Sequence, residues 1–169
     1  MAIPSKLAAL LIVEVVAIII AVPIIIVARP ESVAVAPAEA VEAAVREALA
    51  PPNRGMDRVT AVSVGEGDGG EVGVVLTLNA GLPGLRGLDA KGDVVAVLRA
   101  IRHTGVAYDQ VVVHATFPLV GPLGGISEEP VISAVYSRSV VDATDWERFV
   151  VEGVYLIADG VELLADFAE

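Results

Sequence analysis

The sequence predicts an α+β fold, in which an N-terminal transmembrane helix precedes a small domain with a four-stranded, mostly antiparallel sheet and helices packed on one face. Two observations lead to this prediction. An apolar run occupies residues 7–28, and segments of helical and of alternating apolar periodicity follow one another through residues 38–169. The order is helix, strand, strand, helix, strand, strand and short helices, which lets both pairs of strands join through short connections.

The apolar run 7–28 has the length of a membrane span. As a helix it would extend roughly 33 Å, and a hydrocarbon core is about 30 Å thick. The apolar part of a cleaved signal peptide is shorter, about 7 to 15 residues, so a retained transmembrane helix is the favoured interpretation. Small-x-small sequences at 34–36 and 38–40 keep cleavage open as the alternative. The chain has no cysteine, which excludes a lipobox lipid anchor.

The flanking charges predict the orientation. Residues 1–6 carry Lys6 and the α-amino group, whereas the segment after the span soon becomes acidic. Because excess positive charge stays inside, residues 1–6 are expected to be a cytoplasmic head. Residues 29–37 are expected to be a proline-flanked linker, and residues 38–169 an α+β domain on the extracytoplasmic side of the cytoplasmic membrane.

Glu14 lies about 10 Å inside the apolar run. A carboxyl group at that depth suggests association with another helix within the membrane. Type IV pilins and pseudopilins resemble this arrangement, with a glutamate at the fifth position after leader cleavage, and cutting after Ala9 would put Glu14 there. A pilin-like subunit of an envelope assembly is therefore the alternative function. The single leader lysine, the lack of glycine at the cut, and Pro30 and Pro37 argue against it.

Periodicity and breakers predict the elements of the domain. The predicted segments are a helix over 38–50, a hairpin of strands 59–64 and 72–78, a helix from Asp89 to Gly105, and strands over 111–117 and 131–141. Thr144 and Glu147 match a capping box, which predicts a short helix with Trp146 and Phe149 turned toward the core.

Charge and composition exclude several classes of function. The chain has 22 acidic and 11 basic residues and a net charge of −11, so it should repel nucleic acids and anionic lipid headgroups. With two histidines and no cysteine, no ligand spacing predicts a metal site, and no motif predicts a cofactor. Ser127, Glu128, Asp142 and Asp145 have no spacing typical of an acid–base pair or a catalytic triad, so we expect no catalytic site.

Two loops predict the binding surface. The segments 81–87 and 121–129 are rich in glycine, and loops presented by a rigid sheet often form recognition sites. If the loops converge, their side chains would supply the contacts. The polar contacts would come from Arg86, Ser127, Glu128 and Glu129, and the apolar ones from Leu123 and Ile126. The expected function is a binding or protein-interaction module, whose partner is an envelope protein or a second copy of the chain.

Part of the chain has a family resemblance. The sequences at 128–131 (Glu-Glu-Pro-Val) and 134–137 (Ala-Val-Tyr-Ser), followed by Asp142 and Trp146, lie within a stretch over residues 105–160. This stretch resembles the C-terminal half of uncharacterised single-pass or lipid-anchored envelope proteins of high-G+C Gram-positive bacteria. The resemblance implies an envelope location and a similar fold, and it implies no activity.

Overall fold

The computed structural model describes residues 36–65, 70–82 and 84–168. Within these ranges, no helix is both long enough and apolar enough to cross a membrane. The predicted transmembrane helix 7–28, the cytoplasmic head 1–6 and Glu14 lie outside the described residues.

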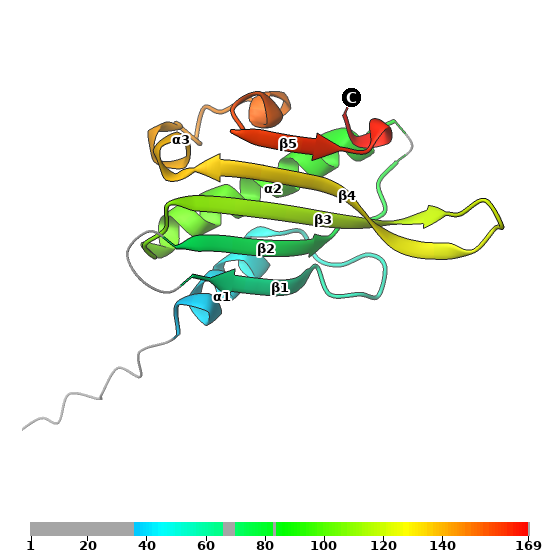
Figure 1. The fold of residues 1–169 in the computed structure, drawn as a ribbon, viewed down its shortest axis with the longest axis horizontal. Coiled ribbons are helices and arrows are strands. Elements are labelled where there is room, and N and C mark those ends of the chain that lie inside the picture. Colours follow the sequence, from blue (N-terminus) through cyan, green and yellow to red (C-terminus); the bar gives the residue numbers. More distant parts are fainter. Residues whose placement is uncertain (1–35, 66–69, 83, 169) are drawn as a thin grey trace, which may run out of the picture. The chain divides into compact units, whose positions relative to one another are not determined.

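The domain is α+β, as predicted (Figure 1). Its elements, in chain order, are α1 (Pro37–Ala48), β1 (Val59–Val64), β2 (Glu71–Thr77), α2 (Arg86–Thr104), β3 (Gln110–Val120), β4 (Ile126–Ser137), α3 (Arg138–Ala143), the 3-10 helix η1 (Val151–Leu156), β5 (Gly160–Leu163) and the 3-10 helix η2 (Ala165–Phe167).

The sheet has five strands in the order β1-β2-β3-β4-β5. The predicted four-stranded, mostly antiparallel sheet needs two corrections. β5 adds a short strand beside β4, and β2 and β3 are parallel while the other neighbours are antiparallel. The parallel pair forms because α2 carries the chain back to the end where β2 began, as a crossover connection requires.

Both long helices, α1 and α2, lie where the sequence predicts them, except that α2 starts earlier than expected. α1 begins with Pro37 in its first turn and buries Val41 and Val45, which are one turn apart. α2 starts at Arg86, so Asp89 lies in its first turn and is not the predicted N-cap. α2 ends where expected, at Gly105, whose φ of 69° is left-handed and easily adopted by glycine.

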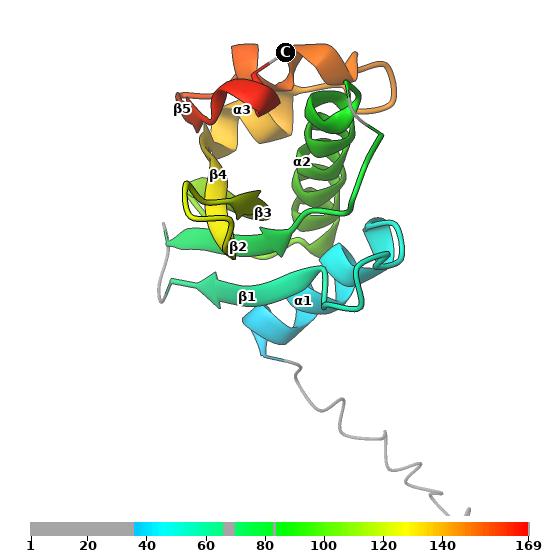
Figure 2. The same ribbon diagram turned by 90° about the vertical axis from the view of Figure 1, so that its right-hand side faces the viewer.

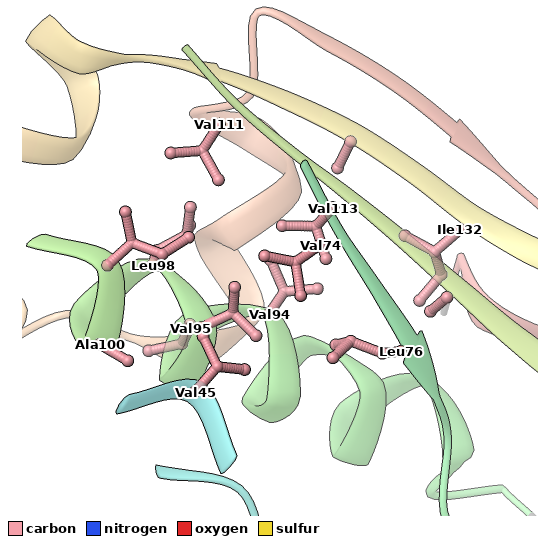
Figure 3. Close-up of a cluster of buried hydrophobic side chains, with 14 of the residues drawn as sticks. Val45, Val74, Leu76, Val94, Val95, Leu98, Ala100, Val111, Val113 and Ile132 are labelled. Carbon is pink, nitrogen blue, oxygen red and sulfur yellow. The ribbon is translucent and has the colours of Figure 1, made fainter. Parts of the chain in front are cut away.

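The hydrophobic core lies between these helices and one face of the sheet. Figure 2 shows α1 and α2 on the same side of the strands. The side chains that meet there, drawn in Figure 3, come from every layer: Val45 of α1, Val74 and Leu76 of β2, Val94 and Leu98 of α2, Val111 and Val113 of β3, and Ile132 of β4. The alternating valines of β2 and β3 are buried on this face, which explains the period of two in the sequence.

The segment after β4 differs from the prediction. The strand expected over 131–141 ends at Ser137, and α3 follows it directly. No helix starts at Thr144, which instead ends α3 and donates from Oγ1 to the Val140 carbonyl at 2.7 Å. Trp146 does point inward, as expected: it is buried, and its Nε1 donates to the Val141 carbonyl at 2.9 Å.

β3 and β4 continue past the rest of the sheet as a two-stranded ribbon. β2 stops pairing at Thr116, and β5 pairs no further than Ile132. Residues 117–131, which we call the arm, therefore have only each other as strand neighbours (Figure 1). The strands predicted over 111–117 and 131–141 left residues 118–130 between them as a connection, but only 121–125 lies outside β3 and β4. Pro118 and Pro130 lie on these strands, because proline is tolerated where a strand edge is unpaired.

Candidate binding surface at the carboxyl ends of the parallel strands

Both predicted loops lie at one end of the domain. Because β2 and β3 are parallel, their carboxyl ends share an edge, and the segment before α2 and the arm follow these two ends. Ligands of sheets with parallel strands commonly bind outside this edge. The chain enters the domain at the other end, where Pro37 lies in a shallow depression with Val64, Gly65 and Val106.

Phe117 fixes the root of the arm. Its ring is 6% exposed and meets Phe167 of η2 edge to face, with the centroids 5.5 Å apart. The guanidinium carbon of Arg54 lies 5.4 Å from the centroid of the Phe117 ring, and that of Arg86 lies 5.0 Å from it. Such cation–π contacts favour a fixed ring position. The arm is therefore fastened by the loop after α1, by the start of α2 and by η2.

The structure brings two of the four predicted polar residues to this root. Arg86, the first residue of α2, contacts Phe117, and Glu128 of β4 forms an ion pair with Arg54, which contacts the same ring. Ser127 and Glu129 lie elsewhere on β4 as an exposed pair, in which Ser127 Oγ donates to Glu129 Oε1 at 2.7 Å. Three of the four thus belong to a strand and not to the predicted loop 121–129.

The end of the arm is apolar and open to solvent. The exposed fractions are 99% for Leu123, 74% for Ile126 and 71% for Val120. We call residues 120–126 the tip. The tip turn is closed by hydrogen bonds from Gly121 N to Gly125 O at 2.7 Å and from Gly124 N to Gly121 O at 2.9 Å. These apolar side chains are therefore held on a defined turn, outside the core.

Beside the root is a cleft of about 620 Å³. Its walls include Leu78, Leu88 and Phe167, and its polar groups include Arg86 and Asp89. Two ends meet around it, the carboxyl end of β2 and the amino end of α2. The cleft has the mixed apolar and polar lining common in ligand sites, although both signs of charge are present.

Arg58 and Asp93 form the inner wall of the cleft. Arg58 is 5% exposed, and its nitrogens donate to the Thr77 carbonyl at 2.9 Å, to the Ala50 carbonyl at 3.1 Å and to Asp93 Oδ2 at 2.5 Å. Burial raises the pKa of Asp93 above its usual range, although the charge of Arg58 lowers it in part. Because Arg58 is bonded to β2, to α2 and to the loop after α1, its role here is to hold the cleft together.

Two asparagines tie the rim of the cleft with reciprocal hydrogen bonds. Asn79 Oδ1 accepts from the backbone N of Asn53 at 3.0 Å, and Asn79 Nδ2 donates to the Pro51 carbonyl at 3.0 Å. In return Asn53 Oδ1 accepts from Ala80 N at 2.9 Å, and Asn53 Nδ2 donates to Ala80 O at 2.9 Å. These bonds hold the loop after α1 against the end of β2.

Sequence reasoning missed most of these positioning residues. Arg54 and Glu128 are 74 positions apart, and Arg58 and Asp93 are 35 apart, so no local spacing relates them. In the part of the chain that the structure describes, no three His, Asp or Glu side chains are grouped as they would be to hold a metal ion.

Comparisons of the chain with protein-family models, with curated proteins and with solved structures find no match.

Proposed function

We propose that this chain is a membrane-anchored binding module, which displays its α+β domain outside the cytoplasmic membrane and engages a protein partner with the tip of the arm. The observation that carries the proposal is the exposure of Leu123, Ile126 and Val120 on the turn of a fastened ribbon. Contiguous exposed apolar side chains are rare on soluble surfaces and typically mark interaction sites.

The fastened root supports the same proposal. Phe117 is held by Arg54, Arg86 and Phe167, so the arm has a set direction before any partner arrives. A contact surface that is already ordered loses less conformational entropy on binding.

The direction of the chain is consistent with a tethered module. α1 starts at Pro37, at the amino ends of β2 and β3, and the arm leaves from their carboxyl ends. A membrane anchor preceding Pro37 would tether the domain by the end opposite to the tip. Ala36 has extended backbone angles (φ −57°, ψ 140°), so α1 begins at Pro37 and does not continue an earlier helix. This does not favour the pilin-like alternative, which needs one long helix.

Site-specific photocrosslinking in intact cells tests the proposal. A photoreactive residue in place of Leu123 or Ile126 of the full chain should give a discrete protein adduct. The same residue in place of Leu156, which is 87% exposed on η1, is the matched control and should not. Equal labelling from the tip and from Leu156, or no adduct from either tip position, would reject the module.

A reporter fused after Glu169 tests the location independently. We expect a reporter that is active only outside the cytoplasm to be active, because Lys6 holds the N-terminus inside. Activity of a cytoplasm-only reporter instead would reverse the orientation.

Glu14→Ala should still insert into the membrane. The favourable insertion free energy of the aliphatic residues in the run already exceeds the cost of one carboxyl group by roughly several kcal/mol, so insertion does not depend on Glu14. The substitution should reduce only associations that occur within the membrane.

A further inference from the structure

Resting on the proposed function, we infer that the arm enters an apolar pocket bordered by basic side chains on a different protein, and that it does so with the side chains of its tip, without adding a strand to that partner.

The edges of the arm argue against strand addition. On β4 the Val131 carbonyl still accepts from Leu164 N at 2.9 Å. Beyond Thr116 on β3 and beyond Val131 on β4, the edges of the ribbon lack a strand neighbour, so they would be open to a partner strand. Pro118 and Pro130 supply no N–H to such a partner. Glu128 and Glu129 add charge beside Pro130 on β4. Prolines and charges are the means by which natural sheets prevent edge pairing, so the edges of the arm are protected.

The tip has no such protection. Val120 and Ile126 are paired directly across the ribbon, and Leu123 extends from the turn between them. Gly124 has a φ of 78°, which a glycine adopts without strain, and this residue allows the chain to turn tightly behind Leu123. Together these residues form a compact apolar knob. An apolar pocket is the complementary surface, because few polar groups of the knob need partners there.

The charge of the arm predicts the rim of that pocket. Between residues 104 and 137 the chain has no lysine or arginine and three acidic residues, Asp109, Glu128 and Glu129. Glu128 is neutralised by Arg54, whereas the exposed carboxylate of Glu129 accepts a hydrogen bond from Ser127. A negative charge therefore lies behind the apolar tip. Basic side chains at the mouth of the pocket would complement it and fix the register.

The negative charge of the arm also disfavours other binding partners of the tip. A second copy would oppose acid with acid, since the chain has a net charge of −11. An anionic lipid surface would repel Glu129 for the same reason. A partner protein with basic groups around an apolar pocket satisfies both features of the arm.

The experiment compares adduct yields from the full chain carrying a photoreactive residue at Leu123, in intact cells. Glu129→Lys should reduce the yield at least about tenfold, because like charges opposed across an interface repel each other, and Glu129→Gln should reduce it roughly two- to threefold. Glu162→Lys, on exposed β5, is the matched control for net charge and should leave the yield unchanged. Circular dichroism of each purified variant checks that the fold is retained.

Several outcomes would overturn the inference while leaving the module in place. An adduct with the mass of two chains would assign the tip to a second copy. Flotation of the purified protein with phosphatidylglycerol vesicles, lost in Leu123→Ser, would assign the tip to the membrane. An adduct from a photoreactive residue at Ser127 that survives Leu123→Ser and Ile126→Ser would indicate strand addition. A yield insensitive to Glu129→Lys would reject the basic rim. If no tip position gives any adduct, the proposed function itself has failed.

Discussion

Arg58 donates to the carboxylate of Asp93 with a separation of 2.5 Å between Nη2 and Oδ2, although the two residues are 35 positions apart in the sequence. Arg58 directly precedes β1 and also donates to Thr77 at the end of β2, whereas Asp93 belongs to α2. One guanidinium thus connects two strands and a helix at the cleft. The arm root, with Arg86 and Phe167 on the same cleft, is positioned by this junction.

The Arg58–Asp93 pair should be costly to break on one side only. Arg58→Ala or Asp93→Ala should each lower the free energy of unfolding by about 3 kcal/mol, because either change leaves a largely buried charge without its partner. In the double variant, the free energy of unfolding should fall by less than the sum of the two single effects. The measurement is urea unfolding of the full chain in detergent, followed by the fluorescence of Trp146, the single tryptophan of the chain.

The exposed pair Arg99–Glu147 is the matched control, with 40% and 78% of the side chains exposed. Removing either partner there should change the free energy of unfolding by less than about 1 kcal/mol, as is typical of surface pairs. Equal effects of the two pairs would show that the Arg58–Asp93 contact does not hold the junction together.

The raised pKa of Asp93 predicts a pH dependence of stability. Between the ordinary carboxyl pKa of 3.8 and the raised pKa in the fold, the folded state holds a proton that the unfolded state has lost. The stability contributed by Asp93 therefore falls as the pH rises through that window and is constant above it. Asp93→Asn lacks this titration. The stability advantage of the parent over Asp93→Asn should shrink as the pH rises, and an advantage that grows with pH would contradict the prediction.

Phe117 should control both the stability of the domain and the order of the arm. Phe117→Ala removes the contacts with Phe167, Arg54 and Arg86 and should cost about 3 to 5 kcal/mol. Phe117→Leu keeps most of the apolar volume and should cost less, but it removes the aromatic and cation–π contacts. Both variants should speed hydrogen exchange of amides within the arm. Unchanged exchange there in Phe117→Leu would show that the arm does not depend on the ring contacts.

Local features of the fold could be predicted from the sequence because each depends on neighbouring residues. The face of α1 with Val41 and Val45, the hairpin of β1 and β2, and the end of α2 at Gly105 all follow from spacing or from a breaker. Strand partners are not local. Nothing near β2 indicates that its second neighbour is the parallel β3 rather than an antiparallel strand, and β5 is too short for a clear alternation.

The candidate surface was also predictable only where it depends on neighbouring residues. Leu123 and Ile126 stood out as apolar residues beside glycines and are exposed at the tip. The segment 121–129 is rich in glycine, which predicted a loop, yet Ser127 and Glu129 lie on β4, whose long pairing with β3 no local pattern indicates. The contacts of Phe117 with Arg54 and Arg86 depend on three separate elements, so no pattern along the chain could show them.

Binding of a partner by the tip is tested by comparing three forms of the chain. The full chain, affinity-tagged after Glu169, is purified from crosslinked cells as the parent, as Leu123→Ser with Ile126→Ser, and as the control Leu156→Ser with Val150→Ser, which removes two equally apolar, exposed side chains elsewhere. We expect one stoichiometric crosslinked partner with the parent and the control, and its loss with the tip variant, while all three unfold at similar urea concentrations. Retention of that partner by the tip variant would show that the tip is not the binding surface.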